Sequence, residues 1–371
     1  MKDSWIIGVI SLVGLAFMGS LAWAFRERVF TGHNDFVQLY TGARLVGRPG
    51  LYDAQRVRRE QQERIGATGE AWRYTRLPYY AALLWPLGRL PFRTAYALWE
   101  LMGLAALAGF VWLWRSTSRP LTLLFTSLCL PVFTSLMNGQ DLTLILLCLA
   151  LAVEQHRRGW SFLAGGILSL CAAKYHLFVL LPLLVAGQKC WRLGGGLAAG
   201  GLALAGLSFA VAGPRWPWQY YEVLMDPAIH PATQHMPNLH GLFGALGPAR
   251  WLEWPAGAAV AAMTLIVARR QPFPYALGAT LAGGLLVSYH SYLPDCSVLL
   301  PAALTALATT TLYWLRLLAV VLLTPAIYFL LLMPAGPGFA VPCAILALLA
   351  LMVWEAWRRP QGTDGRSTLI G

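Results

Sequence analysis

A carboxylate lies close to where the first apolar segment of this chain ends. Asn34 and Asp35 follow Phe25, the last residue of that segment, by nine and ten positions. An acid held at a membrane surface can act as a general base if an acceptor hydroxyl lies within hydrogen-bond reach. We therefore take Asp35 as the candidate catalytic residue. The alternative is structural, since Asp35 could cap a helix that begins at Phe36.

Two further polar sites interrupt apolar sequence downstream. Asn138 and Gln140 stand between two apolar runs, and the carboxamide of Gln140 offers a donor and an acceptor to a sugar or phosphate. Asp141 could cap the helix that follows. Lys174 and His176 divide another apolar stretch, where an ammonium group should face an aqueous cavity or an anion such as phosphate. A lysine that snorkels to the interface is the alternative.

Two more loops carry candidate binding residues. The polar segment 213–249 contains Asn238 and His240. Its histidines lack the short spacings of a metal site, so we expect no metal and interpret the segment as a loop that closes over a sugar. His290 and Asp295 lie in another break between apolar segments and are candidates to bind the sugar or the acceptor. Asp295 could also cap a helix.

The composition places these residues in a membrane protein. The chain has 371 residues, 57% of them hydrophobic and 12% charged, and its mean hydropathy is +0.56. Its apolar runs are long enough to span a hydrocarbon core of roughly 30 Å. The net charge of +12 would suggest a nucleic-acid partner in a soluble protein. Here the cations collect in short loops between apolar segments, as cytoplasmic loops do, so we expect no nucleic acid.

Basic and polar loops alternate along the chain. If the basic loops are cytoplasmic, every polar motif lies on the opposite face. We therefore predict that residues 1–371 form one all-α, polytopic membrane helix bundle with about twelve spans. Segment 160–188 would be a hairpin of two short helices that turns at Lys174, and the short segment 77–91 would be re-entrant. The basic loops contain Arg115, Arg119, Arg157, Arg158, Lys189, Arg192, Arg269, Arg270, Arg316, Arg358 and Arg359.

The first external loop, 26–76, has an internal pattern of its own. Apolar residues recur at helical spacing from Phe36 to Val46, and a charged stretch follows from Asp53 to Gln62. We predict two helices along the interface with their apolar faces towards lipid. An ordinary solvated hairpin is the alternative, and the ten arginines of the loop oppose an external location. The other polar stretches are a second external loop, 213–249, and a cytoplasmic tail, 358–371.

The motifs form an ordered succession over almost the whole chain. They are Asn34-Asp35-Phe36, Tyr40, Gly47, Leu51-Tyr52-Asp53, Tyr74, Pro78, Leu83-Leu84-Trp85-Pro86-Leu87, Asn138-Gly139-Gln140, Ala164-Gly165-Gly166, Lys174, Asn238-Leu239-His240-Gly241 and the stretch from His290 to Asp295. This succession resembles glycosyltransferase family 87. That family includes polyprenol-phosphate-mannose-dependent α-mannosyltransferases of the GT-C superfamily.

The resemblance implies a GT-C-like fold and an inverting glycosyltransferase. Asp35 would be the catalytic base, and Lys174 and Arg76 would lie near the phosphate of a polyprenyl-phosphate sugar donor, with mannose the expected sugar. The acceptor would be a glycolipid or a cell-envelope glycan, and membrane lipids would surround the protein. The resemblance implies no cofactor. The site would face the extracytoplasmic side of a bacterial-type plasma membrane. The chain departs from the family pattern after Lys174, where a proline is expected, and at Asn238-Leu239-His240, where hydroxyl-rich residues are expected.

Two other functions are compatible with the sequence. One is a transporter or flippase for a lipid-linked glycan, and the other is an inactive family member that serves as a scaffold. Transporters often have repeated halves and charged residues near the bilayer midplane. This chain has no convincing internal repeat, and its polar motifs gather at one face, which favours the enzyme.

Overall fold

The computed structural model describes residues 2–66, 72–229, 233–244, 247–333 and 338–358. Helices form all the regular structure of these residues, which contain no strand, as predicted for an all-α protein. The predicted tail from residue 359 onward lies outside the described residues. So do 67–71 of the first predicted external loop and 230–232 and 245–246 of the second.

Long helices alternate with short ones along the chain. The α-helices are α1 (Lys2–Ala24), α2 (Arg26–Thr31), α3 (Phe36–Leu45), α4 (Ala54–Ile65), α5 (Pro78–Leu83), α6 (Trp85–Gly88), α7 (Phe92–Leu113), α8 (Arg119–Leu128), α9 (Leu130–Met137), α10 (Leu142–Arg157), α11 (Ser161–Ser169), α12 (Leu181–Gln188), α13 (Trp191–Ala212), α14 (Trp216–Leu224), α15 (Leu239–Gly244), α16 (Glu253–Arg270), α17 (Phe273–Val287), α18 (Leu299–Thr309), α19 (Tyr313–Leu323), α20 (Ala326–Leu332) and α21 (Ala340–Arg358). The 3₁₀ helices are η1 (Leu170–Leu177), η2 (Pro227–Ile229), η3 (Thr233–His235), η4 (Gly247–Leu252) and η5 (Leu293–Val298).

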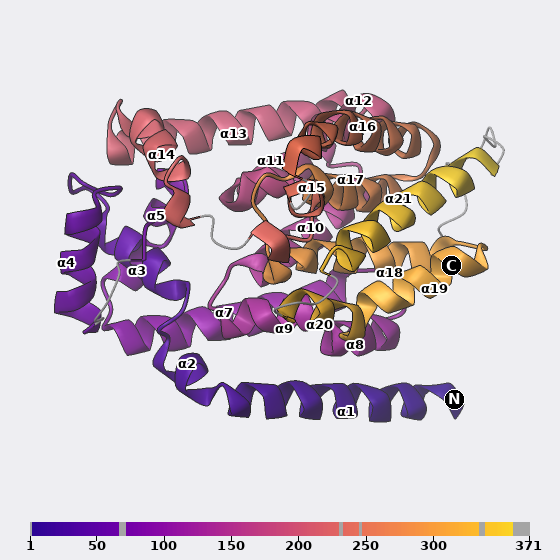
Figure 1. The fold of residues 1–371 in the computed structure, drawn as a ribbon, viewed down its shortest axis with the longest axis horizontal. Coiled ribbons are helices and arrows are strands. Elements are labelled where there is room, and N and C mark those ends of the chain that lie inside the picture. The colour runs from indigo at the N-terminus through magenta and orange to yellow at the C-terminus, as the bar shows by residue number, and fades with distance from the viewer. Residues whose placement is uncertain (1, 67–71, 230–232, 245–246, 334–337, 359–371) are drawn as a thin grey trace.

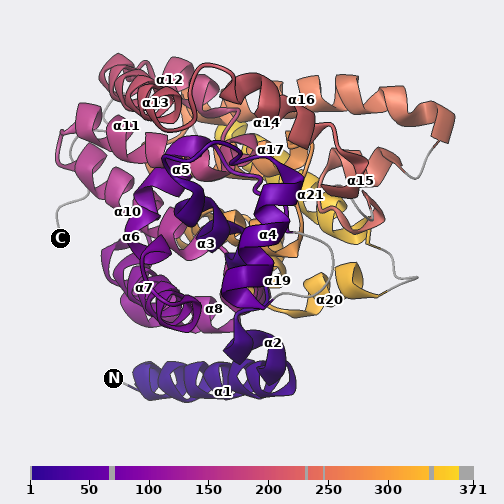
Figure 2. The same cartoon turned by 90° about the vertical axis from the view of Figure 1, so that its left-hand side faces the viewer.

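The two ends of the molecule differ in character (Figure 1). The long helices α1, α7 and α13 run along its longest axis. At one end, on the left of Figure 1, lie α3, α4, α5 and α14, which come from the two predicted external loops and the segment after the first. Figure 2 looks directly on to this end. The start of α1 and the end of α21 lie at the opposite end.

Several helices can cross a membrane. Within the described residues, α7, α13, α21 and the helix Arg250–Arg270 are long and apolar enough, and the number rises to seven if each of three bent helix pairs is one span. Other apolar segments form helices shorter than a full crossing, such as α17 with 15 residues. The chain is thus a multi-pass helical membrane bundle, while the number of about twelve spans stays a prediction.

Residues of two basic loops meet at one end of α10. The carboxylate of Glu154 on this helix binds Arg157 at 2.9 Å and Arg158 at 2.7 Å, and it lies 3.9 Å from Arg115 of the preceding basic loop. Asp141 precedes the other end of the helix. Thirteen residues at helical rise put Asp141 and Glu154 about 20 Å apart. The basic loops and the Gln140–Asp141 turn are therefore well separated.

The predicted hairpin in segment 160–188 is present. Lys174 breaks the helical path with φ −127° and ψ 53°. Both ends of the hairpin contact the short link between α16 and α17. The ring of His156 stacks 3.9 Å from Phe273, and Gln188 donates to the carbonyl of Gln271 at 2.8 Å. The basic residues before and after the hairpin therefore share one end of the bundle.

The first predicted external loop, 26–76, forms the two predicted helices, but the expected lipid contact of α3 is wrong. Phe36 is fully buried, with its ring 5.5 Å from Tyr96 and 5.7 Å from Trp99 of α7. The apolar face of α3 packs against protein because α7 offers a matching row of aromatic rings. Helix α4 is a polar surface helix whose buried residues are Val57 and Gln61.

Segment 77–91 does not cross the bundle as one helix. It forms α5 and α6, of six and four residues, which both pack on α3. Neither helix is long enough to span a bilayer. The segment therefore supports the first predicted external loop, and its partial insertion into the membrane stays a prediction.

Candidate functional site

The turn that carries Asp35 is fixed through its neighbour, Asn34. The side chain of Asn34 is fully buried. Its Oδ1 accepts from the backbone N–H of Phe36 at 3.0 Å, and its Nδ2 donates to the Tyr96 hydroxyl and the Met137 carbonyl, both at 3.1 Å. Asn34 therefore satisfies its polar atoms inside the protein and ties the start of α3 to the end of α9.

Four polar side chains from four segments form one hydrogen-bonded chain. Gln140 Nε2 donates to Asp35 Oδ2. Lys174 Nζ donates to Gln140 Oε1 at 2.8 Å and to Asp295 Oδ1 at 2.5 Å. Lys174 and Asp295 are each 4% exposed, whereas Asp35 is half-buried. Asp35 occupies the N-cap position of α3, but its side chain makes no capping bond there, and the side chain of Asn34 accepts from the first helical N–H instead.

The partners of Gln140 decide how its amide lies. An ammonium group can donate but not accept, and a carboxylate can accept but not donate. The amide nitrogen must therefore face Asp35 and the amide oxygen must face Lys174. Gln140 thus links a buried cation to the candidate base in one defined orientation.

A glycine makes this arrangement possible. Gly139 has φ +60°, and a Cβ atom added to it would lie 2.5 Å from Asn34 Oδ1. Its carbonyl accepts from the indole N–H of Trp99 at 3.0 Å. The left-handed backbone and the close approach both favour a residue without a side chain. Asn138 secures the same turn, since its carbonyl accepts from the backbone N–H of Asp35 at 3.0 Å.

Arg76 binds Asp141, the residue after Gln140. The guanidinium donates through Nε at 3.2 Å and through Nη2 at 3.4 Å to the two carboxylate oxygens. Burial is the largest single influence and acts to lower the pKa of Arg76, but the charge and hydrogen bonds of Asp141, together with the charge of Asp295, hold that pKa above its ordinary value. Asp141 makes no capping bond to α10, so that expectation is wrong. Gln38 on α3 accepts from the backbone and hydroxyl of Thr75, which anchors Arg76 to the same helix as Asp35.

A cavity of about 390 Å³ lies beside this network. Arg76, His176 and His290 supply polar lining, and Ala173 and Tyr175, which flank Lys174 in sequence, also line it. The imidazole rings of His176 and His290 are 6.2 Å apart. His176 Nε2 is buried and has no hydrogen-bond partner among the described residues. A buried donor or acceptor of this kind is suited to a ligand.

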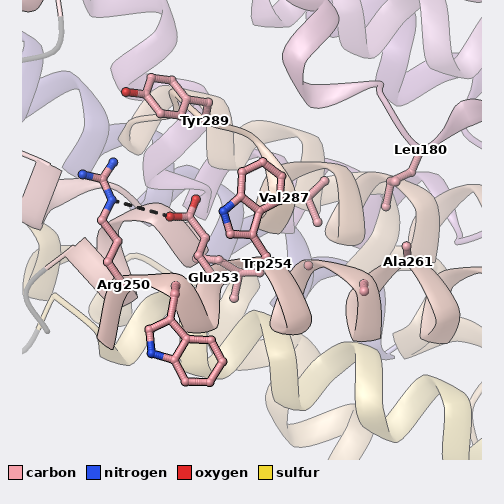
Figure 3. A pocket seen from close by; sticks show the side chains of 11 residues that line it. Leu180, Arg250, Glu253, Trp254, Ala261, Val287 and Tyr289 are labelled. Atoms are coloured by element: carbon pink, nitrogen blue, oxygen red, sulfur yellow. Dashed lines mark ion pairs between the residues drawn. The ribbon is translucent and has the colours of Figure 1, made fainter. Parts of the chain in front are cut away.

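A larger groove of about 840 Å³ lies next to the cavity, and Val287 and Tyr289 line both. Its walls are mainly apolar and include Trp254 and Ala261 of α16 and Leu180 before α12. In Figure 3, Tyr289 lies at one end of the groove, and Leu180 and Ala261 lie at the other. An apolar groove next to a polar cavity fits an amphipathic molecule with a polar head.

The structure places His240 and Asn238 away from the Asp35 chain. His240 Nδ1 lies 3.2 Å from Glu253 Oε2, and its ring is 4.5 Å from the ring of Tyr289, at the polar end of the groove. Asn238 is fully buried and donates to the Ser288 carbonyl at 2.8 Å. Asn238 therefore fastens α15 to the end of α17.

The candidate residues thus fall into three sets. One set forms the hydrogen-bonded chain, a second lines the cavity, and a third holds turns in place or lies at the groove. Direct contact of any of them with a substrate stays a prediction. The sets are Asp35, Gln140, Lys174 and Asp295; then Arg76, His176 and His290; then Asn34, Asn138, Asn238 and His240.

Sequence reasoning missed two contributors. Asp141 received only a capping role, although it is fully buried and binds Arg76. Tyr220 was not among the candidate residues, yet it lines the cavity and donates to the Thr75 carbonyl at 3.3 Å. An acid beside a candidate amide was a usable signal for Asp141. No local signal distinguished Tyr220 from its aromatic neighbours.

The helical bundle defines a multi-pass membrane protein that has a polar cavity at one end. The sequence model of glycosyltransferase family 87 matches residues 74–293, which is more than half of the chain. The chain therefore belongs to this family. It is therefore a glycosyltransferase. The matched range begins after Asp35 and ends before Asp295. No curated protein and no solved structure matches the chain.

Proposed function

We propose that the protein is an inverting mannosyltransferase that uses a polyprenyl-phosphate donor. The acceptor is a glycolipid or cell-envelope glycan at the extracytoplasmic face. One observation carries the proposal: the hydrogen-bonded chain from Asp35 to Asp295 lies beside a cavity lined by Arg76, and an apolar groove shares Val287 and Tyr289 with that cavity. A base, an anion site and a lipid groove are the three parts that this reaction needs.

In the proposed reaction Asp35 takes the proton of the acceptor hydroxyl. The hydroxyl oxygen then attacks the anomeric carbon from the face opposite the phosphate, and the bond between that carbon and the phosphate oxygen breaks. The leaving polyprenyl phosphate keeps the electron pair. Arg76 stabilises its negative charge, and His176 supplies a polar contact through the Nε2 atom that has no partner among the described residues.

In this proposal Lys174 does not contact the phosphate of the donor. Its ammonium group already donates to Gln140 and Asp295. We assign it the task of holding the Gln140 amide against Asp35, so that the carboxylate faces the acceptor in a fixed direction. The phosphate contact predicted for Lys174 passes to Arg76.

The isoprenoid chain of the donor would occupy the groove along α16. Gly257, Ala258 and Ala261 are small residues on one side of this helix and leave room for an alkyl chain. Because Val287 and Tyr289 line both cavity and groove, head and tail of one molecule can occupy both. The basic loops, which meet about 20 Å away at the far end of α10, support an extracytoplasmic site.

The test uses the full chain in lipid nanodiscs with radiolabelled polyprenyl-phosphate mannose and a membrane lipid extract. We compare wild type, Asp35→Asn and Glu63→Gln, a control that changes an exposed carboxylate on α4. Wild type and control should form labelled product, and Asp35→Asn should be at least about 100-fold slower, the usual contribution of a general base.

Three results would contradict parts of the proposal. Undiminished product from Asp35→Asn removes Asp35 as the base. Product from a polyprenyl-phosphate glucose donor, with none from mannose, replaces the sugar. Movement of the donor across vesicles without any product would favour the transporter instead.

A further inference from the structure

A second, polar cleft opens beside the candidate site. It has a volume of about 430 Å³ and is formed by both predicted external loops, with α4 on one side and α14 on the other. The two loops share an apolar cluster that includes Tyr52, Val57, Tyr220 and Val223, so the cleft has fixed walls. Its polar lining consists of Tyr52, Asp53, Arg56, Arg73, Gln219 and Glu222.

The cleft is separated from the donor cavity by a thin wall. Tyr52 lines the cleft, its ring is 5.6 Å from Tyr220 of the cavity, and its hydroxyl donates to the Arg76 carbonyl at 2.8 Å. Arg73 of the cleft and Arg76 of the cavity are three residues apart, so their Cα atoms are at most roughly 11 Å apart. A molecule bound in the cleft is therefore within one or two sugar units of the cavity.

The chemistry of the lining indicates what the cleft can bind. Asp53 and Glu222 offer carboxylates, Gln219 offers an amide, and Arg56 and Arg73 offer guanidinium groups. Two negative and two positive side chains balance, which favours a neutral ligand over a phosphate. Carboxylates and guanidinium groups side by side supply the acceptors and donors that neighbouring hydroxyl groups need.

One atom of the lining residues still lacks a partner. Arg73 binds Asp226 at 3.3 Å through Nη1, but its Nε is buried and has no hydrogen-bond partner among the described residues. A buried N–H of this kind is costly unless a ligand or water accepts from it. This donor adds to the case for a polar ligand next to Arg73.

We propose that this cleft binds the neutral carbohydrate headgroup of the acceptor. Glu222 and Asp53 accept from its hydroxyl groups, and Arg56 and Arg73 donate to its oxygens. The headgroup lies in the cleft, and its reactive hydroxyl extends from there toward the side of the cavity where Asp35 lies. This inference rests on the proposed function, because it assigns the acceptor to a site separate from that of the donor.

The kinetic test varies the acceptor concentration at saturating donor. Glu222→Gln and Arg56→Gln should each raise the KM for the acceptor about fivefold, the loss expected when a charged hydrogen bond becomes a neutral one. The kcat and the KM for the donor should not change. Arg58→Gln, at an exposed position on α4 outside the cleft, is the matched control. An unchanged acceptor KM in both cleft variants overturns the inference while transfer by wild type still supports the proposed function.

A binding test without donor needs no turnover. Octyl α-D-mannoside and octyl phosphate are titrated separately into the full chain in nanodiscs. The mannoside should bind about fivefold more weakly to Glu222→Gln than to wild type, Arg58→Gln or Asp35→Asn. Equal mannoside affinity in Glu222→Gln and wild type overturns the assignment of the acceptor headgroup to the cleft. Octyl phosphate binding that depends on Arg56 also overturns it. Asp35→Asn should bind the mannoside normally but not transfer mannose. The binding test therefore distinguishes a wrong acceptor site from a wrong catalytic base.

Discussion

Asp35 and Lys174 meet through a single side chain, the amide of Gln140. The amide donates to the carboxylate of Asp35 and accepts from the ammonium group of Lys174 at 2.8 Å. Lys174 in turn is neutralised by Asp295. The direction of the candidate base therefore depends on a residue that carries no charge, held by an ion pair deeper in the protein.

Gln140→Glu should abolish this link. A carboxylate cannot donate to Asp35, and its charge would repel that of Asp35. We expect transfer to fall at least about tenfold, since Asp35 loses its orientation and ionises less readily. Initial rates of mannosyl transfer measure the effect. Gln62→Glu, at an exposed position of α4, is the control. Equal rates for Gln140→Glu and wild type would mean that Gln140 does not orient the base.

The Lys174–Asp295 pair should show strong coupling in stability. Lys174→Met leaves a buried carboxylate without its cation, which costs about 3–5 kcal/mol. In the double variant with Asp295→Asn, the neutral amide can still accept from the backbone N–H of Tyr292, so much of that loss should be recovered. Thermal unfolding in detergent measures both. Arg64→Met removes a more exposed partner of Glu60 and should cost less than about 1 kcal/mol. Additive losses in the double variant would contradict the coupling.

Gly139→Ala should damage the site more than Gly159→Ala. Both glycines have positive φ, +60° and +85°, so both substitutions strain the backbone by about 1 kcal/mol or more. Only the Cβ at 139 also meets Asn34 Oδ1, at 2.5 Å, whereas a Cβ at 159 has no atom of the described residues within 4 Å. We expect Gly139→Ala to lose transfer activity and melting temperature together, and Gly159→Ala to keep its activity. The same activity in both would show that the turn can shift freely.

Filling the groove should affect long donors more than short ones. Ala258 lines the groove, and Ala259 is an exposed neighbour on the same helix that does not. Ala258→Trp should raise the KM for a long polyprenyl-phosphate mannose about tenfold, because about two buried CH₂ groups lose their contacts at about 0.8 kcal/mol each. The KM for a citronellyl-phosphate mannose should change little. Ala259→Trp should leave both values near wild type. Equal effects of the two tryptophans would place the alkyl chain elsewhere.

The burial of α3 shows where sequence reasoning reached its limit. The apolar spacing from Phe36 correctly predicted a helix, but spacing does not say whether lipid or protein covers the apolar face. Here Tyr96 and Trp99 of α7 cover it. The same holds for Asp141: its position before a helix suggested a cap, and the arrival of Arg76 from a distant segment gave it an ion pair instead.

Properties that depend on local composition were readable from the sequence. Runs of apolar residues require helices in a bilayer, since backbone groups must be bonded internally, and a lysine within such a run marks a break, as at Lys174. Polar residues in apolar surroundings likewise nominated Asp35, Gln140 and Asp295. Their partnership depends on how helices distant in the chain pack, and many packings bury similar apolar area. Only the tertiary structure decided that Gln140 lies between Asp35 and Lys174, and that the cavity beside them has a groove along α16 as its neighbour.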